Sequence, residues 1–429
     1  MRDKRRLIEW GKNVLIALLT LSAVFLLTMT PLIQDSGLAD LFRPQRAAGS
    51  PDPIGAPSGT VLPARLAVYR DGERYGLQYD DVRMDEAFAS FGPLLGSALA
   101  EAGESRTLTE TEWRGCLRGQ GVYFDFSGSV PISALARWLG GSGECALDGS
   151  ARRVVLAEGE GDSVALCWQD AGDGAFYTCP TTLSRSLHLD PAVEAVTPNG
   201  AYFAFEDAEL SQLLDPGTLV TEEVPSGTQY AVSAPLSAAA GIETLLDELS
   251  FNSQNHAPGS SGEVYLDGAD RLVVEDGGTV TYHAAQGGKY PVESRNGMVS
   301  SALAADSARA LAERTMGTLC GDARLYLISV EESGGGWRVR FGYRLAGSAV
   351  YLYDEGWAAE FLVRDGSITD FTLHLRCYTA TSNETLLLPI DRAAVMLPDL
   401  TKEKRELVIQ YRDSGGQSVS PGWEAVSSE

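Results

Sequence analysis

The residue types that most often perform catalysis are sparse and scattered in this sequence of 429 residues. The four histidines occur singly, and none belongs to an HExxH motif or a close pair, so no histidine-based zinc site is expected. These are His188, His256, His283 and His374. The sequence contains no GxSxG or SxxK nucleophile motif, no GxGxxG fingerprint and no phosphate-binding loop. It therefore predicts no catalytic, metal-binding or cofactor-binding residue, and we expect a protein that is not an enzyme.

The cysteines are the next candidates for chemistry, because an even number of them can form disulfides in an oxidising compartment. The six are Cys116, Cys145, Cys167, Cys179, Cys320 and Cys377. Cys167 and Cys179 flank the turn sequence DAGDG in an apparent hairpin, so they are the candidate disulfide, subject to the strand register. Buried free thiols are the alternative. No CxxC motif or cysteine–histidine spacing indicates a metal site.

Three arginines lie along the segment GWRVRFGYRLA: Arg338, Arg340 and Arg344. They alternate with apolar residues, which is typical of a strand that has one buried face. Because the chain has a formal net charge of −24, this basic row is a candidate contact for an acidic partner surface. The alternative is a solvated strand face whose arginines pair with nearby Asp and Glu. The acidic balance also argues against nucleic acid as a partner.

Residues 14–33, VLIALLTLSAVFLLTMTPLI, determine on which side of a membrane such a contact surface would lie. They contain no charged residue, and as a helix they can cross the ~30 Å hydrocarbon core of a bilayer. Basic residues cluster before this segment, so the positive-inside rule predicts a cytoplasmic tail at 1–13 and an extracellular position for the bulk of the chain. We expect a single-pass protein of the cell membrane. A cleavable signal peptide is the alternative, although the apolar run is long for one and no small-residue cleavage site follows it closely.

The rest of the chain divides by composition into four parts. Residues 34–63 are rich in Pro, Gly and Ser and predict a stalk. Three α+β domains are then expected, at 64–190, at 191–298 with a Pro-rich start, and at 299–429 as a helix followed by a meander of strands. Short alternating segments separated by turn signals predict antiparallel sheets, with helices packed on one face.

Local signals within these domains are specific in places. Arg70-Asp71-Gly72 marks a tight turn between two strands. Residues 84–102 have the apolar spacing of a helix that Gly92-Pro93 is expected to kink or split. Residues 300–320 carry an apolar stripe and predict a second helix.

The order of these parts resembles the YycH and YycI family, membrane-anchored regulators of the essential cell-wall sensor kinase system in Gram-positive bacteria, with the YycH branch the nearer in length and layout. The resemblance lies in the basic tail and anchor and in three further stretches. These are GVYFDFSGSVPISALARWLG, then LLDELSFN with GEVYLDGADRLVVEDGGTVTYHA, then GWRVRFGYRLAGSAVYLYDEGWAAEFLVRDGSITDFTLHL. The last stretch is also similar to the PepSY-type units of that family.

The resemblance implies a non-enzymatic role in signal transduction that needs no cofactor. Its implied partners are a membrane sensor histidine kinase, a sister regulator of the same family, and the lipid bilayer through residues 14–33. It implies control of kinase output, and hence of cell-wall metabolism, through transmembrane and extracellular protein contacts. The alternative is a PepSY-type extracellular domain that binds a ligand or inhibits a protease.

Overall fold

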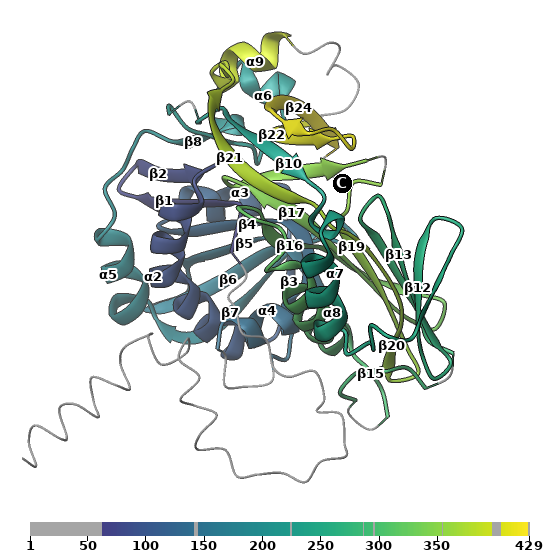
Figure 1. Cartoon of the computed structure of the whole chain (residues 1–429). Helices are drawn as coiled ribbons and strands as arrows, with labels where there is room; N and C mark the ends of the chain where they lie inside the picture. The colour runs from purple at the N-terminus through teal and green to yellow at the C-terminus, as the bar shows by residue number, and fades with distance from the viewer. Residues whose placement is uncertain are drawn as a thin grey trace, which may run out of the picture. The chain divides into compact units, whose positions relative to one another are not determined.

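The computed structural model describes residues 62–427 except positions 141–144, 224, 286, 295–296, 354 and 397–404. The expected transmembrane helix at 14–33 and nearly all of the expected stalk lie outside the described residues. Within the described ranges, no helix is both long enough and apolar enough to span a membrane. The fold is α+β, with mainly antiparallel sheets and helices packed against them, as the sequence predicts (Figure 1).

The first sheet has seven strands, all antiparallel to their neighbours, in the order β2-β1-β4-β5-β6-β7-β3. Asp71 and Gly72 join β1 to β2 with φ values of 54° and 87°, the left-handed conformation that a tight hairpin turn requires. The predicted turn is therefore confirmed. The strands are β1 (Arg65–Arg70), β2 (Glu73–Gln78), β3 (Arg106–Leu108), β4 (Gly121–Pro131), β5 (Ser150–Glu158), β6 (Ser163–Asp170) and β7 (Phe176–Ser184).

Helices cover both faces of this sheet. On one face, α2 (Asp81–Ala100) and α4 (Ile132–Trp138) bury their apolar side chains in the large core. On the other face, α3 (Glu110–Arg118) packs Trp113 and Leu117 into a smaller core. The expectation of helices on one face therefore describes only part of this sheet.

Helix α2 is uninterrupted although it contains Pro93. It begins after Asp80, whose side chain accepts hydrogen bonds from the backbone N–H groups of Val82 and Arg83. Buried apolar residues lie on both sides of the proline, including Phe88 and Leu95. Their packing outweighs the one backbone hydrogen bond that proline removes, so the predicted split does not occur.

The second sheet has twelve strands along the path β11-β12-β13-β14-β20-β19-β17-β18-β22-β24, with β15 beside β20 and β16 beside β17. Strands β18 and β22 run parallel, so this sheet is mixed. The predicted boundary at 298/299 has strands of this one sheet on both sides. The strands are β11 (His256–Pro258), β12 (Gly262–Asp267), β13 (Asp270–Glu275), β14 (Thr279–His283), β15 (Tyr290–Pro291), β16 (Arg324–Ser333), β17 (Gly336–Leu345), β18 (Ser348–Leu352), β19 (Ala359–Arg364), β20 (Ser367–His374), β22 (Arg405–Asp413) and β24 (Pro421–Ser427).

Helix α8 (Ser301–Met316) packs on β16 and β17, with α7 (Ala239–Glu248) beside it (Figure 1). It begins after Ser300, whose side chain accepts a hydrogen bond from the backbone N–H of Leu303. The helix predicted at 300–320 is thus present but ends earlier. Nearly every residue from Ala302 to Ala312 is buried, so α8 is a core helix rather than an amphipathic one.

Smaller elements complete the fold. A three-stranded sheet joins β10 (Thr228–Ser233) to β21 (Cys377–Glu384) and β23 (Ser418–Val419), and a two-stranded sheet joins β8 (Tyr202–Phe203) to β9 (Leu219–Val220). The short helices are α5 (Asp190–Glu194), α6 (Leu210–Leu213) and α9 (Ile390–Met396).

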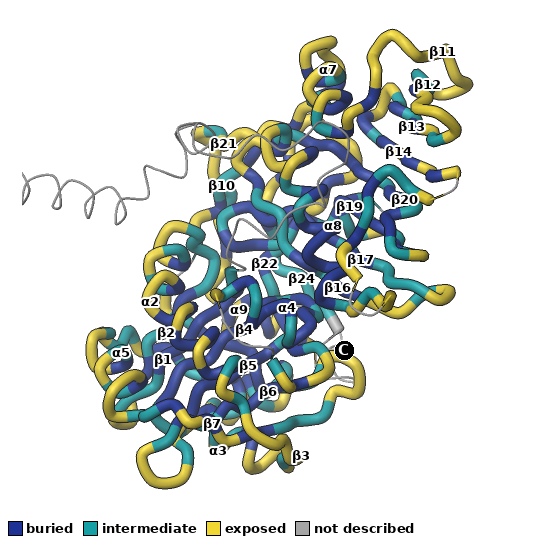
Figure 2. The backbone as a smooth tube through the Cα atoms, turned by 90° about the horizontal axis from the view of Figure 1, so that it is seen from below, coloured by how far each residue is buried: buried dark blue, intermediate teal, exposed yellow. Residues whose placement is uncertain are grey.

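The two large sheets share one continuous core, which Figure 2 shows as buried backbone running from β1 and β4 through α8 to β19. Strand β4 passes close to β16 at Gly128. A Cβ atom added there would lie 2.2 Å from the carbonyl oxygen of Leu327 and 2.7 Å from that of Ile328. Only glycine allows this approach, which brings the two sheets together.

Candidate functional site

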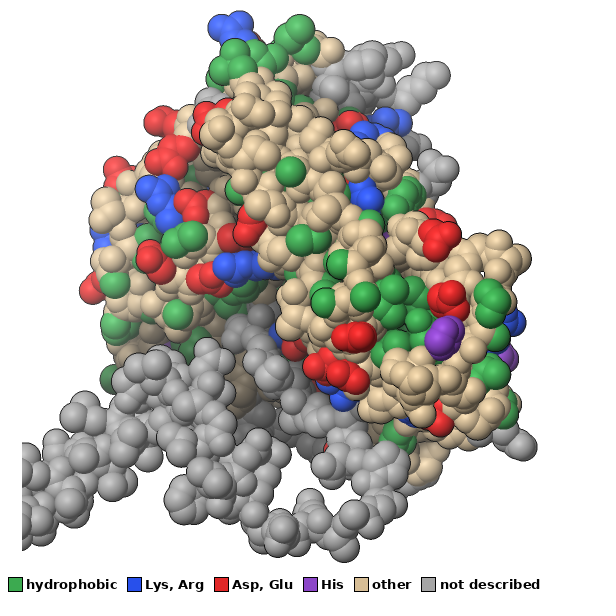
Figure 3. Space-filling view, viewed as in Figure 1, with side chains coloured by type: hydrophobic (Ala, Val, Ile, Leu, Met, Phe, Trp, Pro, Cys, Tyr) green, Lys and Arg blue, Asp and Glu red, His purple; other side chains and the backbone are tan. Residues whose placement is uncertain are grey.

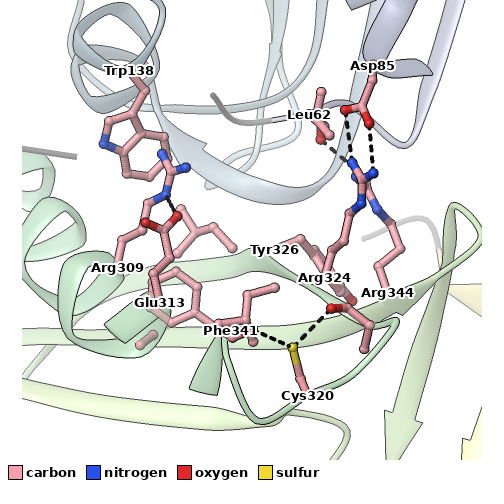
Figure 4. Close-up of a pocket in the computed structure, with 15 residues that line it drawn as sticks. Leu62, Asp85, Trp138, Arg309, Glu313, Cys320, Arg324, Tyr326, Phe341 and Arg344 are labelled. Carbon is pink, nitrogen blue, oxygen red and sulfur yellow. Dashed lines mark hydrogen bonds and ion pairs between the residues drawn. The ribbon is translucent and has the colours of Figure 1, made fainter. Parts of the chain in front are cut away.

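A cavity of about 500 Å³ lies between the helices of the first sheet and the C-terminal strands (Figure 4). We call it the arginine groove, because Arg309, Arg324 and Arg344 line it. Helices α2 and α4 form one wall, and α8, β16 and β17 form the other. Its other lining residues are Leu62, Asp85, Trp138, Ala312, Glu313, Gly317, Cys320, Ala323, Leu325, Tyr326, Leu327 and Phe341.

Arg344 contacts Leu62 and Pro63, the first residues that the structure describes. It is buried on β17, and its Nη1 donates hydrogen bonds of 3.3 Å to the carbonyl oxygens of both Leu62 and Pro63. Its Nε lies 3.5 Å from Oδ1 of Asp81. Burial lowers the pKa of Arg344, and the carboxylate of Asp81 only partly offsets this, while the positive charge of Arg324 lowers it further. The positive charge of Arg344 is therefore incompletely compensated.

Arg324 joins the two walls of the groove. Its Nη1 and Nη2 donate to the two carboxylate oxygens of Asp85 on α2, at 2.9 Å and 2.7 Å. This bidentate hydrogen bonding to Asp85 raises the pKa of Arg324. The pair ties β16 to α2, as Figure 4 shows.

Arg309 lies at the opposite end of the groove. Its Nε donates to Glu313 at 2.7 Å, and its guanidinium carbon lies 4.8 Å from the ring centre of Trp138. Among the described residues, Nη1 of Arg309 has no hydrogen-bond partner. Arg309 is 8% exposed, so this unpaired N–H donor lies inside the protein. A carboxylate or another anion in the groove would satisfy it.

The three arginines of the predicted row are not equivalent in the structure. Arg338 and Arg340 lie on an open part of β17, and both approach Glu360 on β19, at 3.6 Å and 2.7 Å. Arg344 is covered and points into the arginine groove. The acidic side chains visible in Figure 3 are scattered over this face of the molecule. Partner contact by these residues stays a prediction, and Arg344 is the member that belongs to a cavity.

The two cysteines of the predicted hairpin point to opposite faces of the first sheet. In the register of β6 and β7, Cys167 lies opposite Thr178, whereas Cys179 lies opposite Leu166. Cys167 therefore belongs to the small core under α3, and Cys179 belongs to the large core under α2. This register gives no support to a disulfide between them. All six cysteines are thiols in the structure.

Between the first sheet and β22 lies a buried cluster of charges that was not predicted from the sequence, and we call it the charge cluster. It consists of Arg65 on β1, Asp125 on β4, Arg152 and Arg153 on β5, and Glu406 on β22. Asp125 forms ion pairs with Arg65, at 2.9 Å between Oδ2 and Nη1, and with Arg152, at 3.3 Å between Oδ1 and Nε. Both arginines also pair with Glu406. Asp125 and Glu406 are completely buried. Asp125 within the apolar run VYFDF was the available signal, since a charged residue in a buried strand needs a partner.

The arginines determine the ionisation of this cluster. Burial alone would raise the pKa of Glu406, but Arg152, Arg65 and Arg153 outweigh it and hold the pKa well below its usual range. The pKa of Asp125 is lowered in the same way, chiefly by Arg152 and Arg65. Both carboxylates are therefore ionised at neutral pH, and they attach strand β22 to the first sheet.

The histidines lie apart from the groove and from this cluster. Nδ1 of His283 donates a 2.6 Å hydrogen bond to Oδ1 of Asp370 at the surface, and His374 is buried with its ring centre 4.9 Å from that of Trp357. In the part of the chain that the structure describes, no three His, Cys, Asp or Glu side chains are placed to hold a metal ion. The basic donors of the arginine groove suit the binding of an acidic group.

Comparison with known proteins connects this fold to a solved structure. Neither the protein-family models nor the curated proteins give a match to this sequence. The crystal structure of YycH from Bacillus subtilis matches with a TM-score of 0.54 over 85% of this chain and 93% of that chain, at 12% sequence identity. The chain therefore has a YycH-like fold, which confirms the fold expected from the resemblance.

Proposed function

We propose, from its YycH-like fold, that this protein is a non-enzymatic, membrane-anchored regulator that modulates a two-component sensor histidine kinase controlling cell-wall metabolism. Residues 14–33 form its anchor, and the described residues lie outside the cell. It acts together with a sister regulator of the same fold. The observation that carries this proposal is the likeness to YycH over 85% of the chain.

The arginine groove is the contact site that the geometry supports best. Arg309 brings a buried, unpaired N–H donor, and Arg344 brings a positive charge that its surroundings only partly compensate. Apolar residues such as Leu327 and Phe341 line the space between them. An acidic side chain flanked by apolar residues, on an extracellular segment of the kinase or of the sister regulator, fits these groups. Because Leu62 lines the groove, a segment bound there touches the part of the chain that leads to the anchor.

A contact of this kind changes kinase output only if it favours one signalling state over the other. The regulator must therefore bind the two states of the kinase with unequal affinity, through the groove, the anchor or both. The sign of the effect depends on which state is preferred.

The test is reconstitution of the full-length protein with the sensor kinase in membrane vesicles. Autophosphorylation of the kinase is measured with and without the regulator, and with the regulator's residues 14–33 replaced by an unrelated apolar helix. We expect a several-fold change with the native regulator and a smaller one with the replaced helix. An unchanged autophosphorylation rate at saturating regulator, with no co-purification of the two proteins, would contradict the proposal.

One observation favours a second function, a PepSY-type domain that binds a ligand or inhibits a protease. The groove has a volume of about 500 Å³, which is within the range of small-molecule and peptide sites. Co-purification with an extracellular protease in place of a kinase would support this alternative.

A further inference from the structure

Two cysteines meet on the α3 face of the first sheet. Sγ of Cys116 on α3 lies 3.0 Å from Sγ of Cys167 on β6, and both pack in the small core that also contains Trp113. This separation is about 1 Å longer than the roughly 2.05 Å of an S–S bond. A small movement of either side chain would allow the bond to form.

The helix that carries Cys116 has a defined start and packs on the sheet through Trp113 and Leu117. Thr109 and Glu112 form a reciprocal capping box at its start. The ring of Trp113 stacks on that of Phe176 on β7, with centres 4.9 Å apart. The approach of the two sulfur atoms therefore follows from the packing of α3 and does not depend on a loose loop.

The surroundings give the two thiols different roles. Cys116 is half-buried and, with Cys167, lines a second cavity of about 870 Å³ between α3 and strands β5 to β7. Cys167 is buried, and its thiol contacts Thr178 Oγ1 at 3.4 Å. The hydrogen bond with Cys167 lowers the pKa of the Cys116 thiol, so Cys116 is the sulfur that more readily becomes a thiolate.

We propose that Cys116 and Cys167 are an oxidation site that forms a disulfide, with a small or protein disulfide as the oxidant. The thiolate of Cys116 attacks one sulfur of the oxidant, whose S–S bond breaks and releases the first thiol. The deprotonated Cys167 then attacks Sγ of Cys116, breaks the mixed disulfide and releases the second thiol. In total, two thiols of the chain lose two electrons and two protons to the oxidant, which becomes two thiols.

This pairing replaces the Cys167–Cys179 disulfide that hairpin spacing suggested. Cys179 lies in the core on the other face of the sheet, where Cys145 also packs, so it cannot reach Cys167 without a change in strand register. The proposal depends on the geometry of α3 and β6 and does not depend on the proposed regulatory function.

The experiment maps disulfides in the purified full-length protein after incubation with glutathione disulfide. Free thiols are alkylated, and the protein is digested without reduction. Trypsin cuts after Arg114 and Arg118 and isolates Cys116, but it leaves Cys167 and Cys179 in one peptide. A second cleavage at Asp170 and Asp173 separates those two. We expect a Cys116 peptide linked to a Cys167 peptide, with a mass about 2 Da below their reduced sum.

Two variants make the result specific. Cys179→Ser should keep the linked peptide, whereas Cys167→Ser should lose it and leave glutathione attached to Cys116, because no second thiol completes the exchange. A Cys167–Cys179 linkage, a reduced Cys116 or a stable glutathione adduct on Cys116 in the native protein would overturn the proposal. The native peptide map decides the question even if a variant fails to fold. A kinase that does not respond to the regulator would leave the map unchanged, so the two proposals fail separately.

Discussion

The carboxylate of Glu406 pairs with the guanidinium of Arg65, although 341 residues separate them in the chain. Both side chains are buried, and both belong to the charge cluster. The pair links strand β22 in the C-terminal part of the chain to strand β1, the first strand described. Removing one partner leaves a buried charge without compensation, which costs far more than an exposed ion pair contributes.

Replacement of Glu406 by Gln should therefore lower the free energy of unfolding by about 3–5 kcal/mol. Arg65 and Arg152 would keep their buried charges and lose the carboxylate that both contact. Glu424→Gln is the matched control, since Glu424 pairs with Arg412 at 2.7 Å on the exposed side of the same hairpin. Urea unfolding should show a change below about 1 kcal/mol for the control. Equal losses in the two variants would contradict a special role for the charge cluster.

The same cluster predicts a dependence of stability on pH. The native pKa of Glu406 lies below its ordinary value of 4.5, so this carboxylate contributes stability above pH 4.5 that is lost as the pH falls toward the native pKa. We expect the difference in unfolding free energy between native protein and Glu406→Gln to be largest at pH 7 and to shrink at pH 3. Denaturant unfolding at the two pH values measures it. A difference that stays constant to pH 3 would show that the ionised carboxylate is not the cause.

We expect that no side chain larger than that of glycine is tolerated at Gly128, where the two large sheets meet. Gly128→Ala places a Cβ atom 2.2 Å from the carbonyl oxygen of Leu327, so β4 and β16 must separate, at a cost of about 1–3 kcal/mol. Gly115→Ala on α3 is the control, because its Cβ would meet no atom within 4 Å. In a helix this exchange should stabilise by about 0.5–1 kcal/mol. Opposite signs in urea unfolding are expected, and a neutral Gly128→Ala would remove the steric argument.

The arginine groove predicts which arginine matters for partner binding. Arg309→Met removes the unpaired donor and should weaken binding of the kinase or sister regulator about tenfold, the effect of one charge-assisted hydrogen bond. Arg412→Met is the control, because Arg412 also pairs with a carboxylate and lies over an aromatic ring, but outside the groove. Binding is measured by titration of the labelled full-length protein. Equal affinities for the two variants would place the contact elsewhere.

The expected anchor predicts where the protein is found in the cell. If residues 14–33 are the proposed anchor, the full-length chain should sediment with membranes and stay there through a high-pH wash, because an inserted apolar helix is not released by high pH. A chain lacking residues 2–33 should move to the soluble fraction. N-terminal sequencing of the mature protein serves as the check, and a mature chain that begins after residue 33 would support the cleaved signal peptide instead.

Local features of the fold were predictable because they depend on neighbouring residues. The turn at Asp71-Gly72 needs a left-handed backbone, and the start of α8 needs a capping residue such as Ser300. A short run of consecutive residues therefore indicates each of them. Pro93 misled for the opposite reason. Proline does remove a backbone hydrogen bond from the helix, but the burial of α2 against strands that are distant in sequence keeps the helix intact. Which strands pack on α2 cannot be read from the residues around Pro93.

The site was less accessible to sequence reasoning than the fold. Arg344 was correctly placed on a strand with Arg338 and Arg340, but its burial depends on Leu62 and Pro63, which lie far away in sequence. Arg309 gave no signal, because an arginine on a helix usually faces solvent. The approach of Cys116 to Cys167 likewise depends on how α3 lies across β6. Each case joins residues whose proximity only the tertiary fold determines.

The position of Glu406 also bears on how the protein is made. Ribosomes synthesise Arg65, Asp125, Arg152 and Arg153 long before residue 406 emerges, and until then the cluster lacks the carboxylate that contacts all three arginines. The charge cluster is therefore complete only after the last strands of the chain have been made. A chain that stops before residue 406 leaves its buried arginines without this carboxylate, and we expect it to be unstable.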